Sequence, residues 1–210
     1  MIHDPARQRF YERRAAVRRQ FGIPETAILA VSVGVYPKQK GMDRTIAALR
    51  DVPELEFLAV GLKDIAPTRT QAEAEGVLGR CHLFGHSDSV GDILDGADLL
   101  LHPARLENTG LVIVESLLAG VPVIASAACG FAEYVERFAA GMVLPEPFDP
   151  VQYVSAIRLA LNPNTLTDLK SRARESASRI RADGGLDRIL DVIESVFRRR
   201  RDKSLSTHRG

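Results

Sequence analysis

The sequence predicts an α/β protein: a single Rossmann-like, doubly wound parallel sheet with extra C-terminal helices. Two observations predict this fold. Short apolar runs alternate with helix-like segments along most of the 210 residues, which is the pattern of repeated right-handed βαβ units. Several of the apolar runs have apolar residues at successive positions instead of at alternate ones. That pattern is typical of parallel strands that helices cover on both faces.

The elements follow one another in a regular order. Strands are expected at residues 27–34, 55–61, 81–85, 97–103, 121–126 and 141–145. Helices are expected between them near 42–50, 69–79, 88–96, 110–119 and 131–138, and helices alone follow near 150–161, 165–181 and 186–200. We therefore divide the chain into a basic N-terminal helix or linker (1–22), a Rossmann-like domain (23–182), and a C-terminal helix with a basic tail (183–210).

Composition narrows the class of protein. The net charge is +1 with both signs interleaved, unlike a general nucleic-acid binder, whose basic face dominates. No apolar run approaches the roughly 20 residues that span a bilayer, and the N-terminus lacks a secretory signal. Two cysteines give no disulfide framework, so we expect a cytoplasmic location. The basic run at 198–201 either solvates a free chain end or contacts anionic lipid at the inner face of the plasma membrane.

Ligands of an open parallel sheet collect beyond the carboxyl ends of its strands. The loop after the first expected strand, "GVYPKQKG", fits neither the dinucleotide fingerprint nor the phosphate-loop motif. It does place Lys38 and Lys40 beside a strand end, with Gly34 and Gly41 leaving room for the backbone. Two ammonium groups there could neutralise a phosphate. A solvated surface pair of lysines is the alternative.

The segment "RLENTGLVIVESLLAG" holds two glutamates, one in an otherwise apolar run. A helix begins at about Thr109–Gly110, and its first amides lack internal partners, so they favour a phosphate. Glu115 lies about one helical turn, roughly 5–6 Å, beyond that entrance, where ribose hydroxyls could pair with it. Glu107 precedes the helix and could accept hydroxyls of a sugar. The alternatives are a salt bridge to a neighbouring helix for Glu115 and a helix-entry carboxylate for Glu107. The spacing favours a nucleotide sugar as ligand.

Two other groups of residues are rejected as sites. "GHSDS" at 85–89 lacks the closing glycine of a hydrolase elbow, and Ser87 or Asp88 is expected to cap the next helix. The residues Cys81, His82, His86 and His102 suggest zinc, but the first two are adjacent on a strand and point to opposite faces. No Cys-x-x-Cys pair supports them. We interpret them as core residues with satisfied hydrogen bonds, and we expect no metal.

Three segments carry a resemblance to a known family: "VGVYPKQKGMDRTIAAL", the run from Cys81 to Ser126, and "ACGFAEYV". Together they resemble the donor-binding, C-terminal half of GT-B retaining glycosyltransferases of family 4. Within the family, the likeness is greatest to bacterial lipopolysaccharide core glucosyltransferases that act on heptose. It covers residues from about 20 to 180 and includes the two glutamates of an E-x7-E pattern. Val35 departs from the family, many of whose members have arginine there; Lys38 is the candidate substitute.

The resemblance implies roles for individual residues. Glu107 would hold the donor sugar and Glu115 the ribose, while Lys40 would face the diphosphate together with helix amides, so Glu107 and Lys40 are the candidate catalytic residues. The turn at Gly85 and His86 would hold the base. The complete set of candidate donor-binding residues is Gly34, Lys38, Lys40, Gly85, His86, Glu107, Asn108, Thr109, Gly110, Leu111, Val112, Glu115, Cys129 and Gly130.

The leading hypothesis is the donor-binding half of a retaining hexosyltransferase. It would take glucose from UDP-glucose to a saccharide acceptor such as lipopolysaccharide core, without a cofactor. The chain begins about where the linker between the two halves of such enzymes would end, so a separate acceptor-domain chain is an expected partner, or else self-association through exposed apolar surface. The alternatives are a non-catalytic nucleotide-sugar-binding module, one part of a split or truncated enzyme, and a nucleotide-sugar 2-epimerase.

Overall fold

The computed structural model describes residues 5–87 and 90–182. Its six strands form one sheet, in which every pairing is parallel and the order is β3-β2-β1-β4-β5-β6. The strands are β1 (Ile28–Val33), β2 (Leu55–Val60), β3 (Cys81–Leu83), β4 (Leu99–His102), β5 (Val123–Ser126) and β6 (Gly141–Leu144). The predicted α/β class and all six strands are confirmed, each one to three residues shorter than the sequence pattern suggested.

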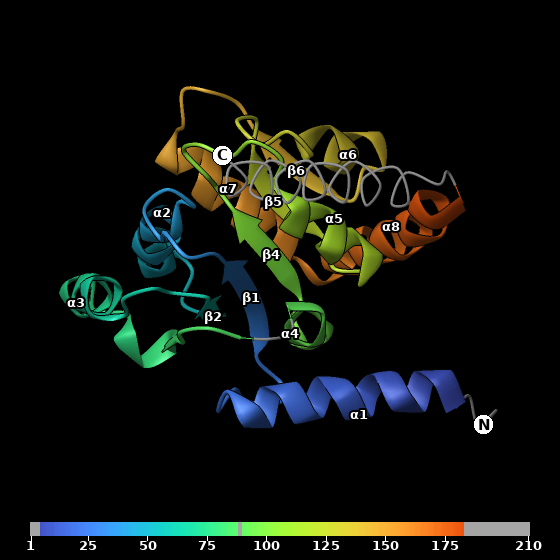
Figure 1. The fold of residues 1–210 in the computed structure, drawn as a ribbon, viewed down its shortest axis with the longest axis horizontal. Coiled ribbons are helices and arrows are strands. Elements are labelled where there is room, and N and C mark those ends of the chain that lie inside the picture. Colours follow the sequence, from blue (N-terminus) through green and yellow to red (C-terminus); the bar gives the residue numbers. More distant parts are fainter. Residues whose placement is uncertain (1–4, 88–89, 183–210) are drawn as a thin grey trace, which may run out of the picture.

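Helices connect the strands and cover both faces of the sheet (Figure 1). They are α1 (Pro5–Gln20), α2 (Met42–Ala48), α3 (Ala66–Ala74), α4 (Val90–Gly96), α5 (Leu111–Leu118), α6 (Ala132–Arg137), α7 (Pro150–Leu161) and α8 (Pro163–Ala182), with short 3₁₀ turns η1 (Leu49–Asp51) and η2 (Leu78–Arg80). Predicted helix 186–200, the basic tail and the proposed cap Asp88 lie outside the described residues.

Alternate residues of each strand enter different cores. Leu99 and Leu101 pack into the core beneath α2, α3 and α7, whereas Leu100 packs into the core beneath α4, α5 and α6. In β1 the same alternation separates Ala30 from Leu29 and Val31. Because both faces are buried, both sets must be apolar, which explains the continuous apolar runs in the sequence.

Two helices differ from their predicted bounds for local reasons. The helix predicted at 69–79 begins at Ala66 and ends at Ala74, because a proline fits its first turn and Gly76, at φ 69°, turns the chain in the left-handed region. The helix predicted at 165–181 begins at Pro163. Its start is fixed by Asn162, whose side-chain oxygen accepts from the amide of Asn164 at 3.1 Å.

Helix α1 packs along α4 at the end of the sheet where β4 begins (Figure 1). The side chain of Val17 lies so close to Gly96 that a Cβ on that glycine would be 2.6 Å from it. Arg18 is 1% exposed and pairs with Asp98 at 2.7 Å. The predicted division at residues 22 and 182 stays a prediction, but α1 is firmly packed against the sheet domain.

Candidate functional site

The strand order places a topological switch point between β1 and β4. Strands β1, β2 and β3 run outward to one side, and β4, β5 and β6 run outward to the other. The chain therefore leaves β1 and β4 in opposite directions, and in open parallel sheets ligands bind beyond the carboxyl ends of the strands at such a point. The loop at residues 34–41 follows β1, and the loop at residues 103–110 follows β4. These are the two loops that the sequence identified as a ligand site.

The loops at residues 34–41 and 103–110 are in close contact with each other. A Cβ on Gly41 would lie 1.9 Å from the carbonyl oxygen of Pro103, so only glycine fits there. Arg105 donates its backbone amide to Gln39 at 2.9 Å and its guanidinium to the Lys38 carbonyl at 2.7 Å. The same guanidinium grips both carboxylate oxygens of Asp43 at 2.6 and 2.7 Å, a bidentate geometry that fixes its orientation. The sequence did not indicate the role of Arg105, because Asp43 lies 62 residues away.

Glu107 is the centre of a small charged cluster. Its side chain is 12% exposed, and Oε2 contacts both the ammonium of Lys40 and Nε2 of His102, the latter at 3.3 Å. The stem of Lys40 reaches Glu107 across Gly34, where a Cβ would lie 2.7 Å from Lys40 Cγ. The hydrogen bond from His102 and the bond and charge of Lys40 lower the pKa of Glu107 to about 2, against the opposite effect of burial. Glu107 is therefore ionised at neutral pH.

His102 is the site residue that sequence reasoning missed. It ends β4, is 1% exposed, and its Nδ1 has no hydrogen-bond partner among the described residues. The interpretation of His102 as a core residue is confirmed, but the expectation that its hydrogen bonds are satisfied is wrong for Nδ1. The available signal was its place, five residues before Glu107 at the carboxyl end of a strand.

Glu115 has the opposite environment from Glu107. It is half-buried on α5, and within the described residues neither a hydrogen bond nor an ion pair reaches its carboxylate. Burial raises its pKa. The salt bridge to a neighbouring helix, which was the alternative explanation for this residue, is absent from the described part of the chain.

The N-terminus of α5 has free backbone donors. Gly110 caps the helix with φ 73° and without a side-chain cap, and the amide of Ile113 is the first to bond back, to the Gly110 carbonyl at 2.8 Å. Within the described residues the amides of Gly110, Leu111 and Val112 have no partner. Free amides and the positive end of the helix dipole favour an anion. In the sequence they lie between Glu107 and Glu115.

The remaining candidates line the same region. Glu107 forms an isolated parallel bridge with Cys129, and a Cβ on Gly130 would lie 2.5 Å from the Asn108 carbonyl oxygen. The Thr109 carbonyl accepts from the amide of Phe131 at 2.8 Å, so residues 107–110 and 129–131 form one unit. Burial raises the pKa of the Cys129 thiol, which therefore stays protonated.

The residues predicted to hold the base follow β3, which lies two strands out from β1. The carbonyl of Gly85 accepts from the amide of Gly61 at 2.8 Å, and Gly61 in turn lies against Gly34. This contact joins the ends of β3, β2 and β1 along one edge. The side chains of His86 and Lys38 are exposed. Their assignment to the donor site stays a prediction.

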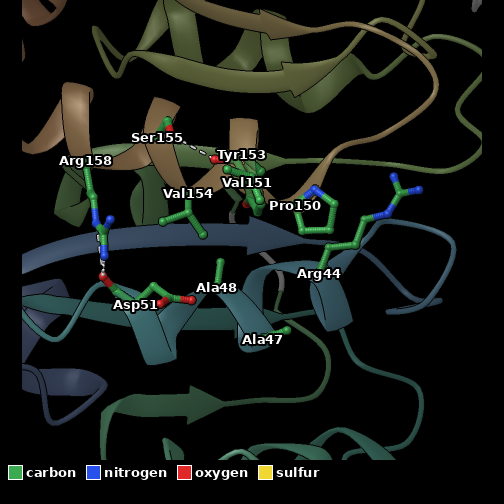
Figure 2. Close-up of a pocket in the computed structure, with 10 residues that line it drawn as sticks. All are labelled: Arg44, Ala47, Ala48, Asp51, Pro150, Val151, Tyr153, Val154, Ser155 and Arg158. Carbon is green, nitrogen blue, oxygen red and sulfur yellow. Dashed lines mark hydrogen bonds between the residues drawn. The ribbon is translucent and has the colours of Figure 1, made fainter.

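We considered two other kinds of site in the described residues, a metal site and a pocket between α2 and α7. Within residues 5–87 and 90–182, no group of three or more His, Cys, Asp or Glu residues is arranged to hold a metal ion; His82, from the rejected zinc group, instead pairs with Glu56 at 2.8 Å. A pocket of about 260 Å³ lies between α2 and α7 (Figure 2). There Arg158 donates from two of its nitrogens to the Asp51 carbonyl, at 3.2 and 2.8 Å, so these donors are already used.

The fold belongs to a known class: it matches the Rossmann-like half of GT-B glycosyltransferases. The family described as glycosyl transferases group 1 matches residues 13–180. The chain belongs to this family.

Two comparisons with relatives agree with this assignment. Over 158 residues the chain is 36% identical to lipopolysaccharide glucosyltransferase WaaG of Escherichia coli K12, a match covering 73% of this chain and 42% of that protein. The crystal structure of WaaG superposes with a TM-score of 0.75 at 34% identity, covering 79% of this chain and 46% of WaaG.

A third comparison supports the fold alone. The structure of Anabaena HepE in complex with UDP-glucose matches with a TM-score of 0.72 at 22% identity, covering 90% of this chain and 54% of HepE. The chain thus spans about half the length of the proteins that it resembles. Within the described residues, no helix is both long and apolar enough to cross a membrane.

Proposed function

We propose that this chain is the donor-binding half of a retaining glucosyltransferase that takes UDP-glucose and transfers its glucose to a saccharide acceptor of the lipopolysaccharide-core type. One observation carries the proposal: Glu115 is a half-buried carboxylate without a partner in the described residues, about one turn from three free helix amides. Leaving a buried charge unpaired is costly unless a ligand pairs with it. Ribose hydroxyls beside a diphosphate would satisfy both features.

The chemistry proposed for the site is electrostatic. The diphosphate would lie at the entrance of α5, where Lys40 and the amides stabilise the negative charge that develops as the sugar departs. Glu107, ionised at neutral pH, would accept hydroxyls of the donor sugar. No metal is needed in this arrangement, because the ammonium and the amides carry the positive charge.

The identity of the donor and acceptor rests on relatives. WaaG is named as a lipopolysaccharide glucosyltransferase, a name that gives glucose as the sugar and lipopolysaccharide as the acceptor. We transfer both properties to this chain as part of the proposal. A cytoplasmic place at the inner face of the plasma membrane fits an acceptor of that kind.

The test is UDP-glucose binding by calorimetry to the wild type, Glu115→Gln and Glu54→Gln. Glu54 is exposed in the turn before β2, at the opposite end of the sheet, and is the matched control. Losing hydrogen bonds to a charged group costs about 1.5–3 kcal/mol, so Glu115→Gln should bind about 10- to 100-fold more weakly. Equal affinity in the wild type and Glu115→Gln would refute the site.

A second candidate is a binding module that takes the nucleotide sugar but transfers nothing by itself. It is favoured by the coverage of less than half of WaaG. The two functions differ in one measurement: release of UDP when the chain is mixed with UDP-glucose and lipopolysaccharide-core acceptor, with and without a co-expressed acceptor domain. Release by the chain alone would exclude the module, and release only after co-expression would identify one part of a split enzyme.

A further inference from the structure

The imidazole of His102 contacts Glu107 from the core side of the site. His102 ends β4, is 1% exposed, and places Nε2 3.3 Å from Oε2 of Glu107. A buried polar group normally has its hydrogen-bonding atoms paired, but Nδ1 of this ring has no partner among the described residues. The orientation of the ring therefore satisfies Glu107 at the expense of Nδ1.

The contact fixes which nitrogen carries the proton. An ionised carboxylate can only accept hydrogen bonds, so Nε2 must be the N–H that donates to Glu107. The hydrogen bond therefore assigns a proton to Nε2.

The other partner of Glu107 has two tasks. In this structure Lys40 pairs with Glu107, and in the proposed function it also neutralises the diphosphate. When the ammonium turns toward phosphate oxygens, its hold on the carboxylate weakens. Among the described residues, the one hydrogen-bond donor then left on Glu107 is His102.

We propose that His102 is a positioning residue: its Nε2–H holds the Glu107 carboxylate toward the donor sugar when Lys40 engages the diphosphate. The inference rests on the proposed function and adds to it. The charged or titratable groups that face Glu107 are Lys40 from the loop after β1, His102 from β4 and the Cys129 thiol from the loop after β5. Of these, His102 and Lys40 donate hydrogen bonds to it.

The first test needs no ligand. The Glu107 carboxyl carbon is followed by ¹³C NMR from pH 7 to pH 1, with Glu107→Gln to assign the signal. In His102→Leu, the midpoint should move by about one unit or more toward the ordinary value of 4.5, because the donor is gone. In His102→Gln the side-chain amide replaces Nε2–H, and the midpoint should stay near that of the wild type. A residue that only fills space would give the same midpoint in all three proteins, which would overturn the proposal.

The second test measures UDP-glucose affinity of the same variants. His102→Leu should bind about 10-fold more weakly or worse, and His102→Gln should recover to within about threefold of the wild type. Should His102→Leu not fold, His102→Asn replaces it, since its shorter amide cannot reach Glu107. A shifted midpoint with unchanged affinity would overturn the positioning role. No UDP-glucose binding by the wild type would instead refute the proposed function, while the titration would still decide whether His102 holds the carboxylate.

Discussion

The polar groups near the two ends of strand β4 differ in how completely they are paired. Asp98, just before the strand, accepts from Arg14, Arg18 and Lys170 and from the amide of Leu29 at 2.9 Å. Burial alone would raise the pKa of Asp98, but Lys170 and Arg14 outweigh it and the pKa is lowered. At the carboxyl end, by contrast, Nδ1 of His102 lacks a partner in the described residues, and so does the carboxylate of Glu115 on the following helix α5. We infer that the paired groups around Asp98 stabilise the fold, whereas the unpaired groups beyond His102 are available to a ligand.

The largest effect should come from breaking the paired end. In Asp98→Asn, the buried guanidinium of Arg18 and its neighbours Arg14 and Lys170 lose their carboxylate. Breaking a buried ion pair by removing one partner costs about 3–5 kcal/mol, so the free energy of unfolding in urea should fall by that amount. The control is Asp168→Asn, since the pair that Asp168 forms with Arg172 is exposed and should matter by less than about 1 kcal/mol.

The difference between the two ends of β4 also predicts that Asp98→Asn leaves the affinity for UDP-glucose unchanged. Asp98 and the proposed donor site lie at opposite ends of β4. UDP-glucose affinity per folded molecule should therefore match that of the wild type within about twofold. A large loss of affinity in the folded fraction would mean that the two ends are coupled.

Most of the fold could be predicted from the sequence, and the reason is physical. A parallel sheet covered on both faces needs continuous apolar runs, which the sequence shows directly. The ends of strands and helices were less certain. Pro163 and Gly76 show why: a proline can start a helix as well as interrupt it, and a glycine ends one only where the chain needs a positive φ.

The site could be predicted only in part. Glu107, Gly110 and Glu115 lie within nine residues, so helix geometry relates them without tertiary information. The ion pair between Lys40 and Glu107 was not predicted, since it spans 67 residues. Lys40 was expected to face a phosphate. The sequence shows that Lys40 and Glu107 both follow strands that end at the same edge of the sheet. It does not show that their side chains contact each other.

The next effect depends on pH. The pKa of Glu107 falls from 4.5 to about 2 on folding, so its contribution to stability is present above pH 4.5 and is lost as the pH falls toward 2. At about 1.4 kcal/mol per pKa unit the contribution is at most about 3 kcal/mol. Urea unfolding from pH 6 to pH 2.5 should show a steeper loss in the wild type than in Glu107→Gln. Parallel curves would show that the cluster does not bind Glu107 as the structure indicates.

Glu115→Gln should have a smaller effect of the opposite sign. Burial raises the pKa of Glu115 in the folded chain, so the protonated form favours folding, and that contribution is lost as the pH rises through the folded pKa. Near neutral pH the unpaired carboxylate opposes folding, and replacing it should leave the free energy of unfolding equal or raise it by up to about 1 kcal/mol. The gain should shrink below pH 4. A clear loss of stability at pH 7 would reveal a partner for Glu115 and remove the contrast with Asp98.

The last effect is on association and not on folding, and it concerns the surface around the site. Three of the large hydrophobic residues that are exposed in the described part of the chain lie on the two site loops: Val35 (48%), Tyr36 (57%) and Leu106 (63%). Exposed apolar groups gathered at one place favour association, so the chain should self-associate weakly through this end. Burying one leucine stabilises by up to about 1.5–3 kcal/mol. In sedimentation, Leu106→Ser should therefore weaken the dimer about tenfold or more, whereas Leu159→Ser, an exposed leucine on α7, should not. If the wild-type chain remains monomeric at high concentration, the prediction of self-association is wrong, and these exposed apolar side chains are tolerated in water.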